Sequence, residues 1–208
     1  MNMQDPIFTV GHSTHKHDAF IALVRQNGIT AICDVRSKPY SRLNPQFNRE
    51  QLERALLSQD IVYRFLGREL GARSDDSDCY EDGKVRYDRL AKTALFKRGI
   101  KRVLRGTNEY RIALLCAEKE PLDCHRAILV ARHLAELGAG IVHIHADGHL
   151  ESHDSALSRL ARMVNVPEDD LFQPKEALIA EAYRRQEQRI AYQIPDLAKS
   201  PTIKSVGA

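Results

Sequence analysis

Short apolar runs alternate with longer amphipathic segments along the chain. Each run is rich in isoleucine, valine, leucine or phenylalanine and is bounded by glycine, proline or polar residues, a pattern typical of buried strands. The runs therefore predict strands over residues 7–10, 29–35, 61–66, 111–116 and 141–145.

Between the runs, apolar residues recur at the spacing of one face of a helix. The first such segment ends at Gly28, and Ser13 or Thr14 precedes it as a candidate cap. Asn48 is expected to cap the next helix, because Gln51 follows it in the position of a capping box. Further helices are predicted over residues 88–105, 124–137, 155–164 and 175–192.

Strands that alternate with helices predict an α/β fold. We expect a single Rossmann-like three-layer domain, in which a mostly parallel sheet of about five strands is flanked by helices. The α/β domain should span residues 1–170, followed by a C-terminal helix over 171–194 that packs on the domain or on a partner in a homodimer. Residues 195–208 lack a pattern and are expected to form a flexible tail, and the acidic connection 67–86 a surface loop or lid.

Composition agrees with an ordinary globular domain. The 208 residues are 43% hydrophobic and 28% charged, and no apolar run is long enough to cross a bilayer. The N-terminus lacks a signal-peptide pattern, so we expect a cytoplasmic protein without a membrane partner. Four cysteines fit a reducing compartment, and a formal net charge of +3 is compatible with an anionic small molecule or nucleic acid as partner.

Polar side chains follow three of the predicted strands, at the edge where an open parallel sheet binds its ligands. Coincidence at one strand end would mean little, but coincidence at three predicts a composite cleft. Thiol, imidazole and carboxylate groups there are candidates for nucleophilic attack and proton transfer, and arginine and glycine for holding an anion. The catalytic candidates are His12, Asp34, Cys116 and Glu118, and the substrate-binding candidates are Gly11, Ser13 and Arg36.

Each of these candidates has a structural alternative. Cys116 ends an apolar strand and is equally suited to burial as a small apolar residue. Asp34 and Arg36 are two residues apart on a strand, so they share a face, where they could form an ion pair that braces the loop. Glu118 could be a solvated loop carboxylate, and His12 a hydrogen-bonded structural imidazole.

The run Cys124-His125-Arg126 is expected in the first turn of a helix, with Asp123 as its N-cap. The unpaired N–H groups of a helix N-terminus favour an anion and lower the pKa of a thiol, so Cys124 is predicted to be a thiolate near neutral pH. His125 is a candidate for proton transfer, and Arg126 for a bidentate grip on a phosphate or carboxylate. The alternative is a packed Cys124 and an Arg126 that caps a surface.

A metal is a third use for the same side chains, because Cys116, Cys124, His125 and His12 offer sulfur and nitrogen ligands. Their spacing matches no standard zinc finger, and the adjacent Cys124 and His125 would have to turn toward the same point. We therefore expect no metal and no other cofactor.

Basic residues dominate the helix predicted over residues 88–105. It carries seven of them and no acidic residue after Asp88. Such a face favours contact with a phosphate backbone, but a solvated face is the alternative, and no aromatic stacking platform accompanies it.

Taken together, these motifs resemble the family catalogued as domain of unknown function 488, over residues 7–145. The resemblance implies a compact α/β domain of a cytoplasmic bacterial or archaeal protein, and it implies no established activity. It rests on the run from Cys116 to Arg126, which reads C-x-E-x-x-P-x-x-C-H-R, on Val10-Gly-His-Ser13, on Asp34-Val-Arg36 with Pro39 and Ser41, on Asn44-Pro-Gln-Phe47 and on Glu69-Leu-Gly71.

These residues leave three functions open. The first is an enzyme that acts on a phosphate-bearing or otherwise anionic ligand, related to nucleotides or nucleic acid, through a Cys/His/Arg site at the strand C-termini. The second is a nucleotide or nucleic-acid binding module without chemistry of its own. The third is a structural or redox zinc/thiol site.

Overall fold

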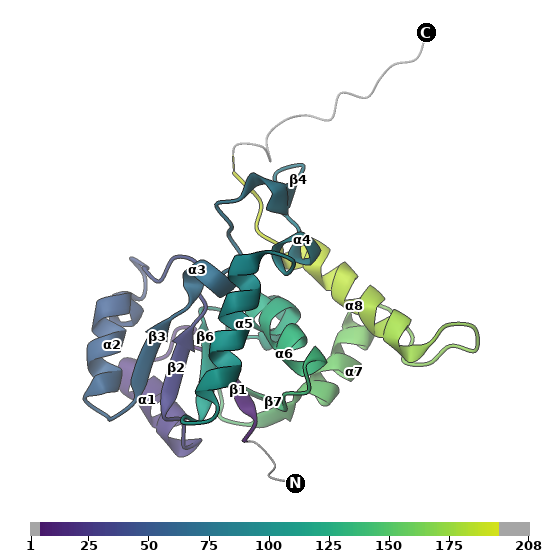
Figure 1. Cartoon of the computed structure of the whole chain (residues 1–208). Helices are drawn as coiled ribbons and strands as arrows, with labels where there is room; N and C mark the ends of the chain where they lie inside the picture. The colour runs from purple at the N-terminus through teal and green to yellow at the C-terminus, as the bar shows by residue number, and fades with distance from the viewer. Residues whose placement is uncertain (1–4, 196–208) are drawn as a thin grey trace.

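The computed structural model describes residues 5–195 and contains a six-stranded sheet in the order β3-β2-β6-β1-β7-β8 (Figure 1). The first five strands in this order are parallel, and β8 pairs antiparallel with β7 at the edge. This confirms the predicted α/β class. The strands are β1 (Ile7–Gly11), β2 (Ala31–Asp34), β3 (Val62–Phe65), β6 (Ile112–Cys116), β7 (Ile141–Ile144) and β8 (Leu150–Ser152), with β4 (Tyr80–Glu81) and β5 (Lys84–Val85) in a separate hairpin.

Helices connect the strands and cover both faces of the sheet. The α-helices are α1 (His17–Gln26), α2 (Arg49–Leu57), α3 (Gly67–Leu70), α4 (Tyr87–Leu90), α5 (Ala94–Gly106), α6 (Arg132–Glu136), α7 (His153–Met163) and α8 (Lys175–Ile190). Three single turns of 3-10 helix are η1 (Pro45–Phe47), η2 (Ser77–Cys79) and η3 (Pro121–Asp123), and η4 (Arg126–Ala131) is a π-helix. No helix in the described part of the chain is long and apolar enough to span a bilayer.

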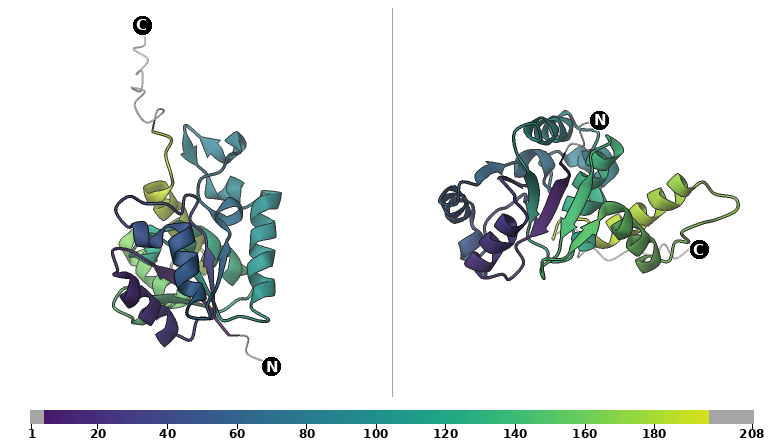
Figure 2. Two further views of the ribbon diagram at one scale, coloured as in Figure 1. Left: turned by 90° about the vertical axis from the view of Figure 1, so that its left-hand side faces the viewer. Right: turned by 90° about the horizontal axis from the view of Figure 1, so that it is seen from below.

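Two apolar cores lie on opposite faces of the sheet. Helices α1 and α2 cover one face, and α5, η4, α6 and α7 cover the other, as both views of Figure 2 show. Successive residues of a strand point to opposite faces. In β6, Ala113 and Leu115 therefore pack with the first core, whereas Leu114 and Cys116 pack with the second. Cys116 thus ends on the side of the sheet where η4 begins.

The register of the central strands aligns their polar C-terminal ends. Gly11 of β1 pairs with Cys116 of β6, and Asp34 of β2 pairs with Leu115, one residue before Cys116. Loops that leave these three strands therefore start side by side at one edge, which is where the sequence predicts a cleft.

The segment between β3 and α5 folds over this edge. It forms α3, the β4–β5 hairpin and α4, so the expected loop or lid has regular structure of its own. The C-terminal helix α8 lies against α7 and η3, where the Gln186 amide donates to the backbone oxygen of Leu122 at 2.8 Å. The helix therefore packs on the domain, one of the two places expected for it, and a homodimer remains a prediction. Residues 196–208 of the expected tail lie outside the described residues.

The cap expected for α1 is wrong, whereas the residue expected to cap α2 is in place without its side-chain bond. Lys16, not Ser13 or Thr14, is the N-cap of α1, because Ser13 has a left-handed backbone with φ of 46°. Asn48 does precede α2, but its side-chain oxygen accepts from the Ser41 N–H and makes no cap bond. The sequence pattern thus predicts where α2 starts, but the side-chain oxygen of Asn48 is engaged by Ser41 and does not bond to the N–H groups of the helix.

Two predicted helices are interrupted. The segment predicted as one helix over 88–105 is α4 followed by α5, and Thr93 caps α5 through a hydrogen bond from the N–H of Phe96. The helix predicted over 124–137 begins as the π-helix η4 and continues as α6. Asp123 is not its cap: His125 is the N-cap of η4, and the carbonyl oxygen of Cys124, which has extended backbone, accepts from the N–H groups of Ala127 and Ile128.

Candidate functional site

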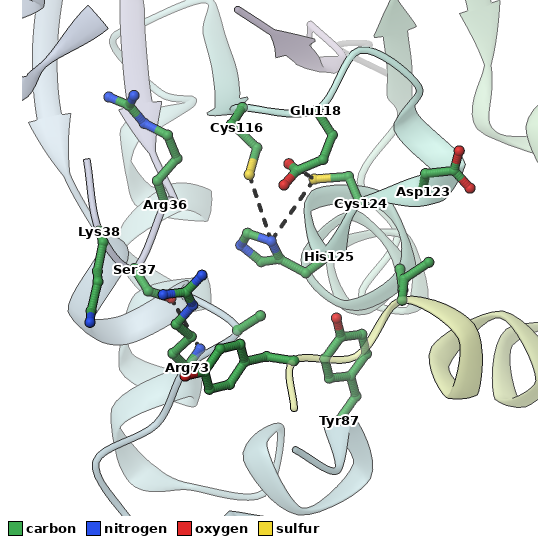
Figure 3. Close-up of a pocket in the computed structure, with 14 residues that line it drawn as sticks. Arg36, Ser37, Lys38, Arg73, Tyr87, Cys116, Glu118, Asp123, Cys124 and His125 are labelled. Carbon is green, nitrogen blue, oxygen red and sulfur yellow. Dashed lines mark hydrogen bonds between the residues drawn. The ribbon is translucent and has the colours of Figure 1, made fainter. Parts of the chain in front are cut away.

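A cavity of about 240 Å³ opens at the C-terminal edge of the sheet, beside the ends of β2 and β6 (Figure 3). The loop after β6 and the start of η4 form one wall, and the loop after β2 forms another. The segment before the β4–β5 hairpin, α4 and the chain after α8 complete it. Its lining residues are Arg36, Ser37, Lys38, Ala72, Arg73, Tyr87, Cys116, Ala117, Glu118, Asp123, Cys124, His125, Ile190 and Tyr192.

Cys124 is held at the N-terminus of the helix that begins with His125. Its sulfur accepts from the N–H of Arg126 at 3.4 Å, as the side chain of an N-cap residue does. The π-helical turns that follow are buried throughout. The thiol is therefore fixed in place and faces the cavity, where helix N–H groups stabilise a negative charge.

Two thiols, an imidazole and a carboxylate meet on this wall, as Figure 3 shows. The Nδ1 atom of His125 lies 3.7 Å from the sulfur of Cys116 and 3.9 Å from that of Cys124. The Cys124 thiol donates to Oε2 of Glu118 at 2.9 Å. The Nε2 atom of His125 donates to the backbone oxygen of Val35 at 3.0 Å, which leaves Nδ1 free to interact with the sulfurs.

The shared environment separates the acidities of the two thiols. Burial raises the pKa of Cys124, but hydrogen bonding with Cys116 and the charge of Arg126 outweigh it and lower this pKa to about 6. Burial and the neighbouring Cys124 raise the pKa of Cys116 well above its usual value. Cys124 is therefore the thiol of the pair that ionises first.

The partners of Cys124 are charged to match. Burial lowers the pKa of His125, but the adjacent Cys124 and Glu118 raise it by more, so the net shift of this pKa is upward. Burial raises the pKa of Glu118, but hydrogen bonds from Cys116 and Cys124 lower it to about 2. Ionisation of Cys124 therefore places a thiolate beside an imidazole whose pKa is raised, an arrangement that activates a sulfur nucleophile.

Asp34, Arg36 and His12 form a closed network behind the cavity. The Asp34 carboxylate accepts from Nε and NH2 of Arg36 at 2.9 and 2.6 Å and from the Tyr63 hydroxyl at 2.7 Å. The remaining NH1 of Arg36 donates to Nε2 of His12 at 3.1 Å, and the His12 ring stacks on Phe47. Burial and the charge of Arg36 lower the pKa of His12 to about 4, so this imidazole is neutral.

This network is the ion pair that braces a loop, the alternative noted from the sequence. Only Arg36 of these three residues lines the cavity, and Figure 3 shows its guanidinium turned away from His125. His12 and Asp34 were expected as catalytic residues, and the structure places both behind the wall, where they orient Arg36 and the strand ends.

Gly11 and Arg126 hold the loop after β6 in place. A Cβ atom on Gly11 would lie 1.8 Å from the backbone oxygen of Glu118, so the close approach that this glycine allows is to the loop and not to a ligand. The guanidinium of Arg126 is fully buried and donates to the backbone oxygens of Glu118 at 2.7 Å and Lys119 at 3.3 Å. Arg126 was expected to bind substrate, but its hydrogen bonds and its position outside the cavity lining favour a bracing role.

Ser13 lies outside the site. Its N–H donates to the backbone oxygen of Ala117 at 2.9 Å, and its side chain lines a different cavity, of about 400 Å³. That cavity also contains His145 and His149, whose rings stack at 3.9 Å. The loop after β1 therefore places no side chain in the lining of the site, and its His12 reaches the cavity only through Arg36.

Four side chains of the cavity were missed by the sequence reasoning. Lys38 and Arg73 are exposed cations, and neither makes an ion pair with any of residues 5–195. The ring of Tyr192 lies under the Arg73 guanidinium at 4.3 Å, and Tyr87 approaches the thiols from α4. Lys38 could have been found, because it follows Arg36 in the same loop. Arg73, Tyr87 and Tyr192 carry no local signal, since tertiary folding brings them to the edge.

Three soft ligand atoms converge in the site: the sulfurs of Cys116 and Cys124 and a nitrogen of His125 all lie within 4.8 Å of one another. The adjacent Cys124 and His125 do turn toward the same point, contrary to the objection raised from the sequence. His12 is not part of this group.

Comparison with known proteins identifies one family. The model of the family described as "Domain of unknown function DUF488" matches residues 16–133, more than half of the chain, and includes the thiol loop and η4. No curated protein and no solved structure matches.

Proposed function

The chain belongs to the DUF488 family, and from this premise we propose that it is an enzyme whose Cys124 thiolate attacks an electrophilic group of an anionic substrate. One observation carries the proposal. A single cavity presents the Cys124 sulfur, with His125 and Glu118 beside it, opposite the uncommitted cations Lys38 and Arg73. Reactive groups and binding groups thus face one small space, as a nucleophilic mechanism requires.

The proposed reaction is a hydrolysis in two steps. The Cys124 thiolate forms a bond to the electrophilic atom of the substrate, the bond to the leaving group breaks, and His125 gives its proton to the leaving group. A water molecule then attacks the same atom and gives a proton to His125, and the bond to sulfur breaks. The Cys124 thiolate and the His125 imidazolium are restored, and the negative charge of Glu118 favours the protonated form of His125.

The charge of the cavity indicates the substrate class. Lys38 and Arg73 lie across from the thiols, and stacking on Tyr192 orients the Arg73 guanidinium. Two cations near one point favour a phosphate or carboxylate. A volume of about 240 Å³ accommodates such a group with few attached atoms, so a larger molecule would present only its reacting end. Because the reaction needs a reduced thiol, we place the protein in the cytoplasm.

Alkylation tests the nucleophile. Iodoacetamide is added at neutral pH, and mass spectrometry follows each cysteine separately. We expect Cys124 to react at least about tenfold faster than the buried Cys33, and the variant His125→Gln to slow Cys124 alone. Equal rates at Cys124 and Cys33 in the native protein would refute the thiolate mechanism.

Activity is tested with generic chromogenic phosphate esters and carboxylic esters. We expect turnover to be abolished by Cys124→Ser. It should be retained by Cys33→Ser, which removes a buried thiol of β2 that does not line the cavity. Burst kinetics with release of one leaving group per protein would support the covalent intermediate. Turnover that survives in Cys124→Ser would contradict it.

One observation favours the second candidate function, a nucleic-acid binding module. The exposed side of α5 carries Lys97, Arg98, Lys101 and Arg105, and none of these makes an ion pair with a residue in the described part of the chain. A basic face of this kind attracts a phosphate backbone, with an affinity that falls steeply as salt rises. Fluorescence anisotropy with a generic oligonucleotide tests it, and absence of binding at low salt would exclude it.

A further inference from the structure

The donor atoms of Cys116, Cys124 and His125 have the separations of ligands around one metal ion. The His125 nitrogen is 3.7 and 3.9 Å from the two sulfurs, and all three atoms lie within 4.8 Å of one another. With Zn–S bonds of about 2.3 Å and Zn–N bonds of about 2.0 Å, tetrahedral ligands are roughly 3.5–3.8 Å apart. A shift of a few tenths of an ångström in the His125–sulfur distances therefore brings these contacts to the zinc geometry.

The orientation of His125 is a second observation, independent of the sulfurs. Its Nε2 atom donates to the backbone oxygen of Val35 at 3.0 Å, which fixes the ring and leaves the lone pair of Nδ1 directed at the thiols. Histidine ligands of metals are almost always held in this way, by a carbonyl or carboxylate that accepts from the other ring nitrogen. The buried ring thus has the tautomer and the aim that a metal ligand needs.

Charge and burial agree with a divalent ion. All three residues are buried, so loss of the proton from both thiols requires a compensating positive charge beside them. A divalent ion supplies it in full, and sulfur and imidazole ligands select a thiophilic ion over magnesium or calcium.

We propose that Cys116, Cys124 and His125 form a binding site for a thiophilic divalent ion, with zinc the first candidate. The fourth position faces the cavity, where either the Glu118 carboxylate or a water molecule can complete a tetrahedron. Two cysteines and a histidine with an open fourth position are one of the ligand sets found in catalytic zinc sites.

The metal site does not depend on the proposed thiolate mechanism, although both use Cys124. A bound ion occupies the sulfur, so the nucleophilic reaction belongs to the metal-free protein. The loaded protein would instead hold an electrophilic centre facing the same two cations, Lys38 and Arg73.

Metal content and cobalt spectra test the site. The protein is purified without a polyhistidine tag or chelator, and bound metal is measured by plasma mass spectrometry. We expect about one equivalent of zinc, and, after exchange for cobalt, the near-ultraviolet absorption of thiolate-to-cobalt charge transfer. Cys116→Ser, Cys124→Ser and His125→Gln should each weaken binding at least about tenfold, whereas Cys33→Ser and Cys79→Ser, which remove buried cysteines outside the cavity, should not.

A measurement on the wild-type protein alone guards against variants that fail to fold. Zinc is added to chelator-treated protein, and iodoacetamide labelling of each cysteine is mapped. We expect zinc to protect Cys116 and Cys124 and to leave the labelling of Cys33 and Cys79 unchanged. Cobalt-loaded protein without a charge-transfer band, or zinc that protects neither thiol, would overturn the proposal.

The outcomes separate the two proposals. Metal-free protein that reacts rapidly at Cys124 but binds no zinc retains the thiolate mechanism and loses the metal site. Protein that binds zinc, but whose metal-free Cys124 reacts no faster than Cys33, retains the metal site and loses the thiolate mechanism.

Discussion

The guanidinium of Arg126 donates to the backbone oxygen of Glu118 at 2.7 Å from a side chain that is fully buried. This bond, with a second to the oxygen of Lys119, ties the loop after β6 to the helix that carries Cys124 and His125. The two halves of the thiol site are therefore joined by one residue that does not line the cavity.

Replacement of this guanidinium should cost stability. Arg126→Met retains most of the volume but leaves two loop carbonyls without their donor, and we expect a loss of about 2–4 kcal/mol in the free energy of unfolding. Urea denaturation measures it. Arg98→Met removes an exposed arginine of α5 and should change the free energy by less than about 0.5 kcal/mol. Equal effects of the two substitutions would rule out a bracing role for Arg126.

Gly11 provides a separate test of the same loop. Gly11→Ala should destabilise the protein by about 2 kcal/mol or more, because its Cβ would lie 1.8 Å from the backbone oxygen of Glu118. Gly140→Ala is a matched control, since its Cβ would find its nearest neighbour at 3.6 Å, an ordinary contact. Thermal unfolding compares the two. If Gly11→Ala is as stable as Gly140→Ala, the close packing of strand end and loop is refuted.

Buried histidines predict a loss of stability in acid. His143 accepts or donates at both nitrogens, to Thr9 at 2.8 Å and to His153 at 3.0 Å, and burial lowers its pKa to about 3. Burial also lowers the pKa of His153. Both rings are neutral in the folded protein but take up protons when it unfolds below about pH 6.5, so unfolding becomes easier as pH falls from about 6.5 toward 3.

The contribution of His143 to this slope is measurable. Each such histidine contributes about 1.4 kcal/mol per pH unit to the fall in the free energy of unfolding. Between pH 6 and 4, His143 should contribute about one of the protons that the protein takes up on unfolding, and His143→Gln should remove that contribution from the slope of the unfolding free energy against pH. His149→Gln, at an exposed site, should leave the slope unchanged. NMR of the wild type provides a second readout, and titration of His143 near pH 6.5 would contradict the prediction.

The two free cations of the cavity should control anion binding. We expect the double variant Lys38→Gln with Arg73→Gln to bind a nucleoside monophosphate about tenfold more weakly or worse, because two charge-assisted contacts are lost. Isothermal titration calorimetry measures it. The double variant Lys97→Gln with Lys101→Gln changes the net charge equally on α5, away from the cavity lining. Equal weakening in both would show that net charge, and not the cavity, attracts the anion.

Local pattern was sufficient for the sheet and for the edge that carries the chemistry. All five predicted strands are present, because apolar runs such as Ile112–Cys116 are buried on both faces and read alike in sequence and structure. The edge strand β8 was missed, since Leu150–Ser152 is short and two of its three residues are exposed. Cys116, Glu118, Cys124 and His125, which line the cavity, could be selected from the sequence because strand ends and helix starts leave local signals.

The roles of the charged residues could not be predicted in the same way. Arg36 and Arg126 look alike in the sequence, because each follows a polar group at a strand end or helix start. In the structure Arg36 pairs with Asp34, and Arg126 binds loop carbonyls. The pair of Arg36 with Asp34, two residues away, was one of the alternatives given by the sequence, whereas the turn that brings Arg126 to the carbonyls of Glu118 and Lys119 leaves no signal in the pattern. Arg73, Tyr87 and Tyr192 entered the site only once the fold was known, because segments far apart in the chain bring them there.

Ile190, the last residue of α8, and Tyr192, two residues further on, line the cavity from outside the segment that the family model matches. The thiol loop and the C-terminal chain beside it thus come from different parts of the sequence, the first within the matched segment and the second outside it. On the proposed mechanism, a change in this C-terminal chain would alter which molecules enter the cavity and would leave Cys124 and its neighbours in place.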